Sequence, residues 1–395
     1  MRRSDLALVL AGTGLIAGTY GLVRLAYGLY LPDVDADLGL GADLGGWTAA
    51  GGSVAYCVGA VTGVVASHRP RALVAGAVLT ASVGSVAMAV APGAGLFVPA
   101  AVVASTCAGL ASPGLVALVA RTVEAGRRDR AQAWVNAGTG PGLAAAGALA
   151  LVLLPHWRPA LVVAAASTAA AGIAVLVLDR GTSAAPARAS APLLRQARLL
   201  LRPAVAAVLL GAGSAAVWTY GRSHLVREGA GTDGSTLAWV ALGLGGTATV
   251  LTARRLGRLR AAEAWRVTSV AVAVSIAALA LLGGSTVAGV TACAAFGWAY
   301  VAASSALITW AGERVADDPA AGTAVLFVAL VAGQAAGAAL GGAVADAVGL
   351  RTVLLGSAAI ALTAAAAAGT QRSRWNTSGM PSRSSSRVSS TSIRR

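Results

Sequence analysis

Residues Leu6–Leu31 have the sequence LALVLAGTGLIAGTYGLVRLAYGLYL, in which Arg24 is the one charged side chain. A helix needs about 20 consecutive, mostly apolar residues to cross a bilayer, because backbone groups in lipid must bond within their own segment. This stretch is long enough to cross. It is also too long for the apolar core of a cleavable signal, and no small-residue cleavage pattern ends it. We therefore predict a first helix that stays in the membrane.

Eleven further apolar runs of similar length follow along the chain. Charged residues make up 11% of the sequence and the mean hydropathy is +0.74, whereas soluble domains carry about 25% charged residues. Too few charges remain to cover a water-facing surface, so the excess apolar surface must face lipid. We predict an all-α integral membrane protein with twelve transmembrane helices over residues 6–31, 45–66, 72–91, 95–120, 131–154, 159–178, 204–224, 235–253, 265–283, 285–311, 322–345 and 352–370.

The arginines indicate how these helices thread the membrane, because cytoplasmic loops carry an excess of basic residues. With the N-terminus inside, 25 of the 30 arginines fall in segments on the cytoplasmic side. The outer loop after the first helix carries no base and four acids, Asp33, Asp35, Asp37 and Asp43. We predict a bacterial inner-membrane protein with both termini in the cytoplasm. The net charge of +15 then needs no nucleic-acid partner, since no aromatic-rich basic face accompanies the arginines.

The predicted helices fall into two sets of six. The longest internal connector, 179–203, is rich in Ala, Ser, Pro and Arg and lies near the middle of the chain. Within it, Leu193–Leu201 places two arginines on one face among leucines, which is typical of a segment lying on the membrane surface. We predict a six-helix bundle over 1–178, a cytoplasmic connector over 179–203, a second bundle over 204–370 and a disordered basic cytoplasmic tail over 371–395.

Three short strings accompany this layout. They are GLVRLAYGLYLPDVDADLGL at Gly21–Leu40, GTGPG at Gly138–Gly142 and HWRP at His156–Pro159. With the two sets of six helices they resemble the major facilitator superfamily, and the first string resembles the G-x-x-R-x-x-Y-G-x-x-L-P pattern of its YbfB/YjiJ-like branch. The resemblance implies two bundles that rock about a shared central site, with the second, fifth, eighth and eleventh helices lining the interface.

Other positions depart from the superfamily pattern. In the loop after the second helix, Ser67 stands where the pattern has an acid that helps latch the cytoplasmic gate. Arg254 stands at the equivalent position after the eighth helix, and Ser105 stands where the fourth helix would carry an arginine. Gating and proton-coupling roles that depend on those residues therefore do not transfer to this chain.

Glycines repeat at every fourth position in three of the helices that the resemblance assigns to the interface. Such a spacing makes a flat stripe on which another helix can pack closely. The stripes are Gly59 and Gly63, Gly138 and Gly142, and Gly333, Gly337 and Gly341. One interpretation is a moving interface between the bundles, and the other is static packing.

Arg24 is the strongest candidate for a binding residue. A cation inside a membrane helix costs about 3 kcal/mol or more on insertion scales, so it is expected to face protein or water. At 100° per residue, Tyr20 and Tyr27 share its face. A cation flanked by two phenols suits an anionic or aromatic substrate. The alternative is a structural arginine that bonds carbonyl groups or reaches outward to the membrane surface.

Further candidates come from the other helices. In the seventh, Trp218 and Arg222 lie one turn apart near the outer mouth, either as an anchor at the membrane interface or as a substrate-facing pair. Asn136, Trp298 and Gln334 are polar or aromatic residues that either line the cavity or bond neighbouring helices.

The sequence carries no pattern for a metal or a cofactor. Its three cysteines lie in apolar runs without metal-like spacing, and its three histidines lie near loops. Proton coupling usually needs a carboxylate buried in the membrane. None lies in the middle of a predicted helix, which leaves Asp33, beside Pro32, as the candidate for coupling.

These features favour a monomeric secondary active transporter that moves a small anionic or amphipathic solute by alternating access, with proton-coupled efflux left open. The substrate site would combine Arg24, Tyr20 and Tyr27 with Trp218 and Arg222 opposite. The alternatives are a membrane-embedded enzyme acting on a lipid-linked substrate and a non-transporting receptor or scaffold. The first would need clustered His, Asp or Glu at one membrane face, and the second would usually carry a folded soluble domain.

Overall fold

The computed structural model describes residues 3–179 and 193–368, and every element in these ranges is helical. In chain order they are α1 (Arg3–Ile16), the π-helix η1 (Ala17–Arg24), α2 (Tyr27–Leu38), α3 (Gly41–Val65), α4 (Pro70–Ala89), α5 (Ala94–Thr122), the short 3-10 helix η2 (Ala125–Arg127), α6 (Arg128–Asn136), α7 (Thr139–Leu153), α8 (Trp157–Leu178), α9 (Leu193–Arg227), α10 (Gly231–Leu256), α11 (Ala261–Leu282), α12 (Thr286–Arg314) and α13 (Pro319–Ala367).

Eleven stretches of these described helices are long and apolar enough to cross a membrane. The last, α13, is 49 residues long and would extend about 73 Å as one helix, roughly twice what a bilayer needs. Gly349 interrupts it with φ 78° and ψ 153°, a conformation that favours glycine because it has no Cβ. The two parts of α13 match the runs predicted at 322–345 and 352–370. The predicted all-α, twelve-crossing membrane fold is confirmed.

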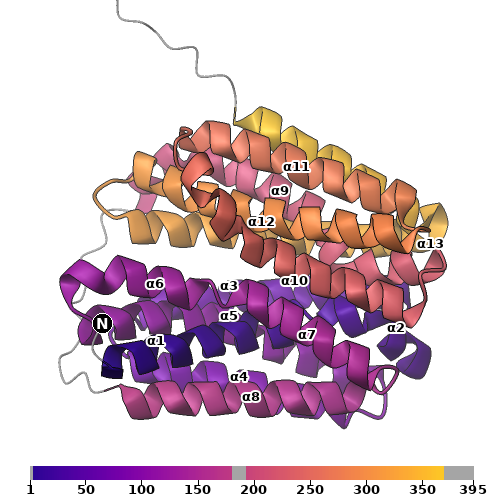
Figure 1. Cartoon of the computed structure of the whole chain (residues 1–395), viewed down its shortest axis with the longest axis horizontal. Coiled ribbons are helices and arrows are strands. Elements are labelled where there is room, and N and C mark those ends of the chain that lie inside the picture. Colours follow the sequence, from indigo (N-terminus) through magenta and orange to yellow (C-terminus); the bar gives the residue numbers. More distant parts are fainter. Residues whose placement is uncertain (1–2, 180–192, 369–395) are drawn as a thin grey trace, which may run out of the picture.

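The helices run side by side in two groups (Figure 1). Helices α1–α8 form the group drawn from indigo to magenta, and α9–α13 form the group drawn from pink to yellow. We call the end of the molecule where α1 begins the terminal end, and the opposite end, where α2 ends, the far end. The groups meet most extensively along α7 and α10 and along α3 and α13.

The first crossing is longer and less regular than a single helix over 6–31. It changes from α-helix to π-helix at Ala17, turns at Leu25 and Ala26, and continues as α2 to Leu38. The acids Asp33, Asp35 and Asp37 therefore lie on a helix. Their prediction as residues of an outer loop was wrong. The helix ends at Gly39, whose φ of 65° is left-handed.

The predicted surface segment 193–201 also differs. Leu193–Arg227 is one continuous helix that passes through Pro203, so the segment extends the seventh crossing and is not a separate helix. Residues 180–192 of the predicted connector and the whole predicted tail lie outside the described residues.

The glycine stripes pack within the groups and not between them. A Cβ on Gly59 or Gly63 would meet α5, and a Cβ on Gly138 or Gly142 would meet the first crossing. In α13, the equivalent atoms on Gly333 and Gly337 would meet α9. Of the two interpretations of the stripes, these contacts fit static packing within each group and do not fit a moving interface between the bundles.

A different set of glycines brings the groups together. Gly140 and Gly147 of α7 pack against α10, where Gly243 meets the backbone of Ala144. At the far end, Gly46 of α3 packs against Ala338 and Gly342 of α13 and the hydroxyl of Tyr220. Without side chains at these positions the two backbones approach directly.

Towards the terminal end, the faces of α7 and α10 that pack together in the middle of the molecule separate. Asn136 lies one turn before Gly140 and is exposed, and Leu251 lies one turn after Thr247 and is 81% exposed. The interface is thus closed from the middle of the helices to the far end and open towards the terminal end.

Candidate functional site

The site is built around a discontinuity in the first crossing. The π-helix ends at Arg24, and regular α-helix resumes at Tyr27. π-Helical turns inside α-helices occur frequently at functional sites, and transporters often form their substrate sites at discontinuous helices. Close packing on both sides holds the irregular segment in place. A Cβ on Gly21 would overlap the backbone of Gly142, and one on Gly28 would overlap the carbonyl oxygen of Trp218.

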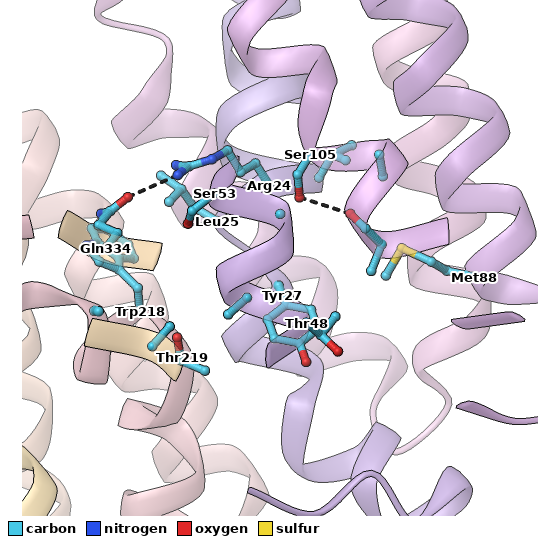
Figure 2. A pocket seen from close by; sticks show the side chains of 17 residues that line it. Arg24, Leu25, Tyr27, Thr48, Ser53, Met88, Ser105, Trp218, Thr219 and Gln334 are labelled. Atoms are coloured by element: carbon cyan, nitrogen blue, oxygen red, sulfur yellow. Dashed lines mark hydrogen bonds between the residues drawn. The ribbon is translucent and has the colours of Figure 1, made fainter. Parts of the chain in front are cut away.

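Arg24 extends from this discontinuity towards the other helix group. Its Nη2 donates a hydrogen bond of 3.0 Å to Gln334 Oε1 in α13, and its Cζ lies 4.6 Å from the centre of the Tyr56 ring. The second contact is a cation–π interaction, worth about 0.5–2 kcal/mol depending on burial. Figure 2 shows Arg24 and Gln334 pointing towards one another from the two groups.

The charge of Arg24 has no acidic partner among the described residues. Its Nε is buried and makes no hydrogen bond. The described ion pairs use other arginines: Arg71, Arg121, Arg127, Arg158 and Arg222. Among the described residues, the Arg24 guanidinium is compensated only by the Gln334 amide and the Tyr56 ring.

Arg24 lines a partly open cavity of about 50 Å³ between the groups. A water molecule needs roughly 10–15 Å³ of such space, so in this conformation the cavity has room for a few waters, and an organic solute would need the two groups to move apart. Hydroxyl groups and apolar side chains share its wall. The lining residues are Val23, Arg24, Leu25, Tyr27, Thr48, Ala49, Gly52, Ser53, Met88, Ala101, Ala104, Ser105, Ala215, Trp218, Thr219, Gln334 and Ala338 (Figure 2).

An aromatic cluster forms the wall on the side of α9. The ring of Trp218 lies 5.2 Å from Tyr300, 5.4 Å from Phe296 and 6.3 Å from Trp239, all in edge-to-face geometry. The indole Nε1 of Trp218 is buried and has no hydrogen-bond acceptor. The cavity thus combines a cation without an acidic partner among the described residues, an unused N–H donor and aromatic surface.

Four of the sequence-predicted residues line this cavity and one lies beside it. Arg24, Tyr27, Trp218 and Gln334 line it. Tyr20 does not, and its hydroxyl lies 3.2 Å from that of Tyr56. The prediction that Tyr20 and Tyr27 flank Arg24 is therefore wrong for Tyr20, which lies outside the cavity lining. The π-helix and the turn change the angle between successive residues, so Tyr56 supplies the ring against the guanidinium.

The other three predicted residues lie elsewhere, two of them far from Arg24. Asn136 is exposed and accepts a hydrogen bond of 3.1 Å from Gln132 at the terminal end. The Trp298 indole donates to Thr252 Oγ1 at 2.9 Å, away from the cavity lining. Neither Asn136 nor Trp298 lines the cavity with Arg24.

The third, Arg222, is buried at the far end, where it joins the two groups. It is 1% exposed, forms an ion pair with Asp33 of α2, and donates to the Leu29 carbonyl at 2.7 Å and to Ser235 Oγ at 3.2 Å. Of its two expected roles, the anchor at the membrane interface does not fit this burial, and Arg222 does not line the cavity with Trp218. Tyr220, two residues earlier, donates to the carbonyl of Ala42 in the other group at 3.1 Å.

Sequence reasoning missed Asp33 as a buried ion-pair partner and the hydroxyls of Thr48, Ser53 and Thr219 as cavity residues. Asp33 looked like a loop residue because Pro32 precedes it, although Pro32 lies inside α2. Ser and Thr occur in many of these helices, and most of them bond carbonyls of their own helix, as Thr48 does with Leu44. Only the packing shows which hydroxyls face the cavity.

These features define a multi-pass helical membrane protein with a cavity between two helix groups, lined by apolar side chains, hydroxyls and one arginine. The sequence model of the Major Facilitator Superfamily matches residues 13–329, and the chain belongs to that superfamily. The protein is therefore a transporter rather than an enzyme. No curated protein matches the sequence.

Solved structures of the superfamily fold align over nearly the whole chain. The nucleoside transporter NupG is 16% identical with a TM-score of 0.73, over 93% of this chain and 98% of that one. A D-xylose–proton symporter is 15% identical with a TM-score of 0.72, over 92% and 97%. A bacterial homolog of the human lysosomal transporter Spinster, in an inward-facing and unoccupied conformation, is 13% identical with a TM-score of 0.69, over 93% and 97%. At these identities the likeness concerns the fold alone.

Proposed function

We propose that this secondary transporter moves a small organic anion, and that the anionic group binds Arg24 in the cavity between the two helix groups. The observation that carries the proposal is that Arg24 is partly buried, has a buried Nε without a hydrogen bond, and has no acidic partner among the described residues. A carboxylate or phosphate would supply the missing charge and accept from the unused Nε. Charge-assisted hydrogen bonds of this kind are roughly twice as strong as neutral ones.

The rest of the cavity suits an amphipathic solute. The Trp218 indole offers a second N–H donor beside aromatic surface, and Ser53 and Ser105 offer hydroxyls on the opposite wall. An aromatic or apolar body can pack against Trp218 while its anionic group contacts Arg24. We propose Arg24, Tyr27 and Trp218 as substrate contacts; Gln334 lines the same cavity and accepts a hydrogen bond from Arg24.

The transport cycle would be alternating access, with residues 1–178 rocking against 204–370. The far end is closed by Arg222, Tyr220 and the glycine contacts, while the terminal end is open. Arginine-rich loops at the terminal end support a cytoplasmic location for that end and for both chain termini. The conformation described here would then be inward-facing, in a bacterial inner membrane.

Proton coupling would act through Asp33. Its carboxylate pairs with Arg222 across the two groups and also lines an outer groove with Asp37, His156 and Arg158. Protonation of Asp33 would remove one charge from the ion pair and weaken closure of the far end. Efflux driven by protons entering from the far side fits this arrangement.

Two narrower assignments are also proposals. The string Gly21–Leu40 supports membership of the YbfB/YjiJ-like branch, since its arginine, tyrosine and glycines form the discontinuity at the site. We further propose that the protein works as a monomer.

The test is a thermal-shift screen of organic anions, cations and neutral solutes on the purified protein, followed by transport assays in proteoliposomes. We expect stabilising compounds to carry a carboxylate or phosphate. Arg24→Gln should weaken their binding about 10- to 100-fold, the range for a lost hydrogen bond to a charged group. The matched control is Arg158→Gln, which removes an arginine that does not line the cavity. Hits that are all cationic, or anion binding unchanged in Arg24→Gln, would contradict the proposal.

A further inference from the structure

The partner that Arg24 uses in this structure is an uncharged amide from the opposite helix group. Gln334 is 5% exposed, and its Oε1 accepts from Arg24 while its Nε2 donates to the Tyr300 hydroxyl at 2.9 Å. A guanidinium has donors only, so the amide oxygen must face Arg24 and the amide nitrogen must face Tyr300. Tyr300 thereby holds the Gln334 oxygen in position for Arg24.

An amide oxygen and a carboxylate oxygen make the same kind of contact with a guanidinium. In a cavity of about 50 Å³, few waters are present to take over that contact. Each time an alternating-access carrier passes through its closed state without substrate, Arg24 must be shielded from bulk water. A charge that is shielded with no acceptor makes this passage unfavourable.

We propose that Gln334 takes the place of the substrate's anionic group on Arg24 in the empty carrier, and so allows the empty carrier to change conformation. This inference rests on the proposed function, because it assumes that an anion normally occupies Arg24. In the loaded carrier the substrate compensates Arg24, and Gln334 is dispensable. In the empty carrier Gln334 is essential. Net transport, which includes the return of the empty carrier, therefore depends on Gln334, whereas exchange of bound solutes does not.

The test measures conformational switching of the empty protein, so it needs no substrate. Fluorophores are attached at Ala36→Cys and Thr232→Cys, two exposed far-end positions in opposite groups, with Cys57→Ser removing the partly exposed native thiol. Single-molecule energy transfer then reports how long the protein stays in each state. We expect the parent to switch, and Gln334→Leu to lengthen both dwell times about 10- to 100-fold, the range for a lost charged hydrogen bond.

Two further variants separate charge compensation from packing. Gln334→Glu keeps an acceptor for Arg24 and should switch at close to the parent's rate. The double variant Arg24→Leu/Gln334→Leu has no charge to shield and should also regain the parent's rate. Unchanged dwell times in Gln334→Leu, a double variant as slow as the single one, or a parent that never switches would each overturn the inference.

Sodium benzoate, an aromatic carboxylate, distinguishes this inference from the proposed function. If both hold, benzoate shortens the dwell times of Gln334→Leu by compensating Arg24. If Gln334→Leu is slow and the double variant is fast, but neither benzoate nor any anion from the screen has an effect, the role of Gln334 stands and the proposed substrate class fails.

Discussion

The two ends of the interface between the helix groups are held in opposite ways. At the far end, Arg222 and Asp33 form an ion pair across the groups, Tyr220 bonds the carbonyl of Ala42, and Gly28 lies against the backbone of α9. Towards the terminal end, Asn136 and Leu251 are exposed, and in the terminal half of α3 the groups share a weak hydrogen bond of 3.7 Å from the Cys57 thiol to the Val328 carbonyl.

The difference shows how an asymmetric carrier can be built from similar helices. Directional contacts and direct backbone packing close the far end, and they must break together when it opens. Both groups carry arginines at the terminal end, among them Arg128 and Arg254, and like charges there favour separation. The superfamily pattern has acids that latch this end, whereas Ser67 and Arg254 occupy those positions here.

The largest expected effect comes from removing the ion pair that closes the far end. Asp33→Asn leaves Arg222 buried without its counter-ion, which costs roughly 3 kcal/mol and raises the population with an open far end about 100-fold. The reporter is Ala50→Cys in a background lacking native cysteines, since Ala50 is packed against Ala215 and Ala338 of the other group. Its reaction rate with a membrane-impermeant maleimide added from the far side measures that population.

Asp37→Asn is the matched control for this change. Asp37 also pairs with an arginine, Arg158, but both residues are in the same helix group and both are partly exposed. Exposed pairs contribute about 0–1 kcal/mol, so the reporter should react at nearly the parent's rate. Equal rates for Asp33→Asn and the parent, or equal increases for both variants, would show that the ion pair does not hold the far end closed.

A smaller effect is expected from Gly28→Ala. The added Cβ would overlap the carbonyl oxygen of Trp218, so the far end would close only with a backbone shift. Overpacking of this kind costs about 1–3 kcal/mol, which predicts an increase of about 5- to 100-fold in labelling of Ala50→Cys. Gly356→Ala is the control, because a Cβ at that position meets nothing within 4 Å. A reporter that reacts no faster in Gly28→Ala than in the control would mean that backbone contact is not required there.

Composition and run length were enough to predict the membrane fold and the twelve crossings, because a bilayer imposes the length and the apolar character of each helix. Arg24 was also identifiable, since a lone cation in an apolar run is rare and costly. The residues that surround Arg24 could not be identified from the sequence. After the π-helix and the turn at Leu25 and Ala26, Tyr27 lines the cavity with Arg24, whereas Tyr20 lies beside it against Tyr56, whose ring contacts the guanidinium.

The partners across the interface could not be predicted because they depend on tertiary packing. Asp33 and Arg222 are 189 positions apart, and Arg24 and Gln334 are 310 apart. Periodicity showed that Gly59 and Gly63 support close packing, but it could not tell whether the neighbour belongs to the same helix group. Gly140 and Gly147, which do meet the other group, are seven positions apart and so lie on one face of α7 without forming a repeat of four.

The central claim is that the two groups rock about the Arg24 cavity, so that one end opens as the other closes. Electron spin resonance distances test it directly, with spin labels at Ala36→Cys and Thr232→Cys across the far end and at Ala133→Cys and Ala253→Cys across the terminal end, all exposed positions. Comparing Asp33→Asn with the parent, we predict a new population in which the far-end distance is longer and the terminal-end distance is shorter. Distances that both lengthen, or a far end that opens while the terminal end stays unchanged, would contradict a rocking carrier.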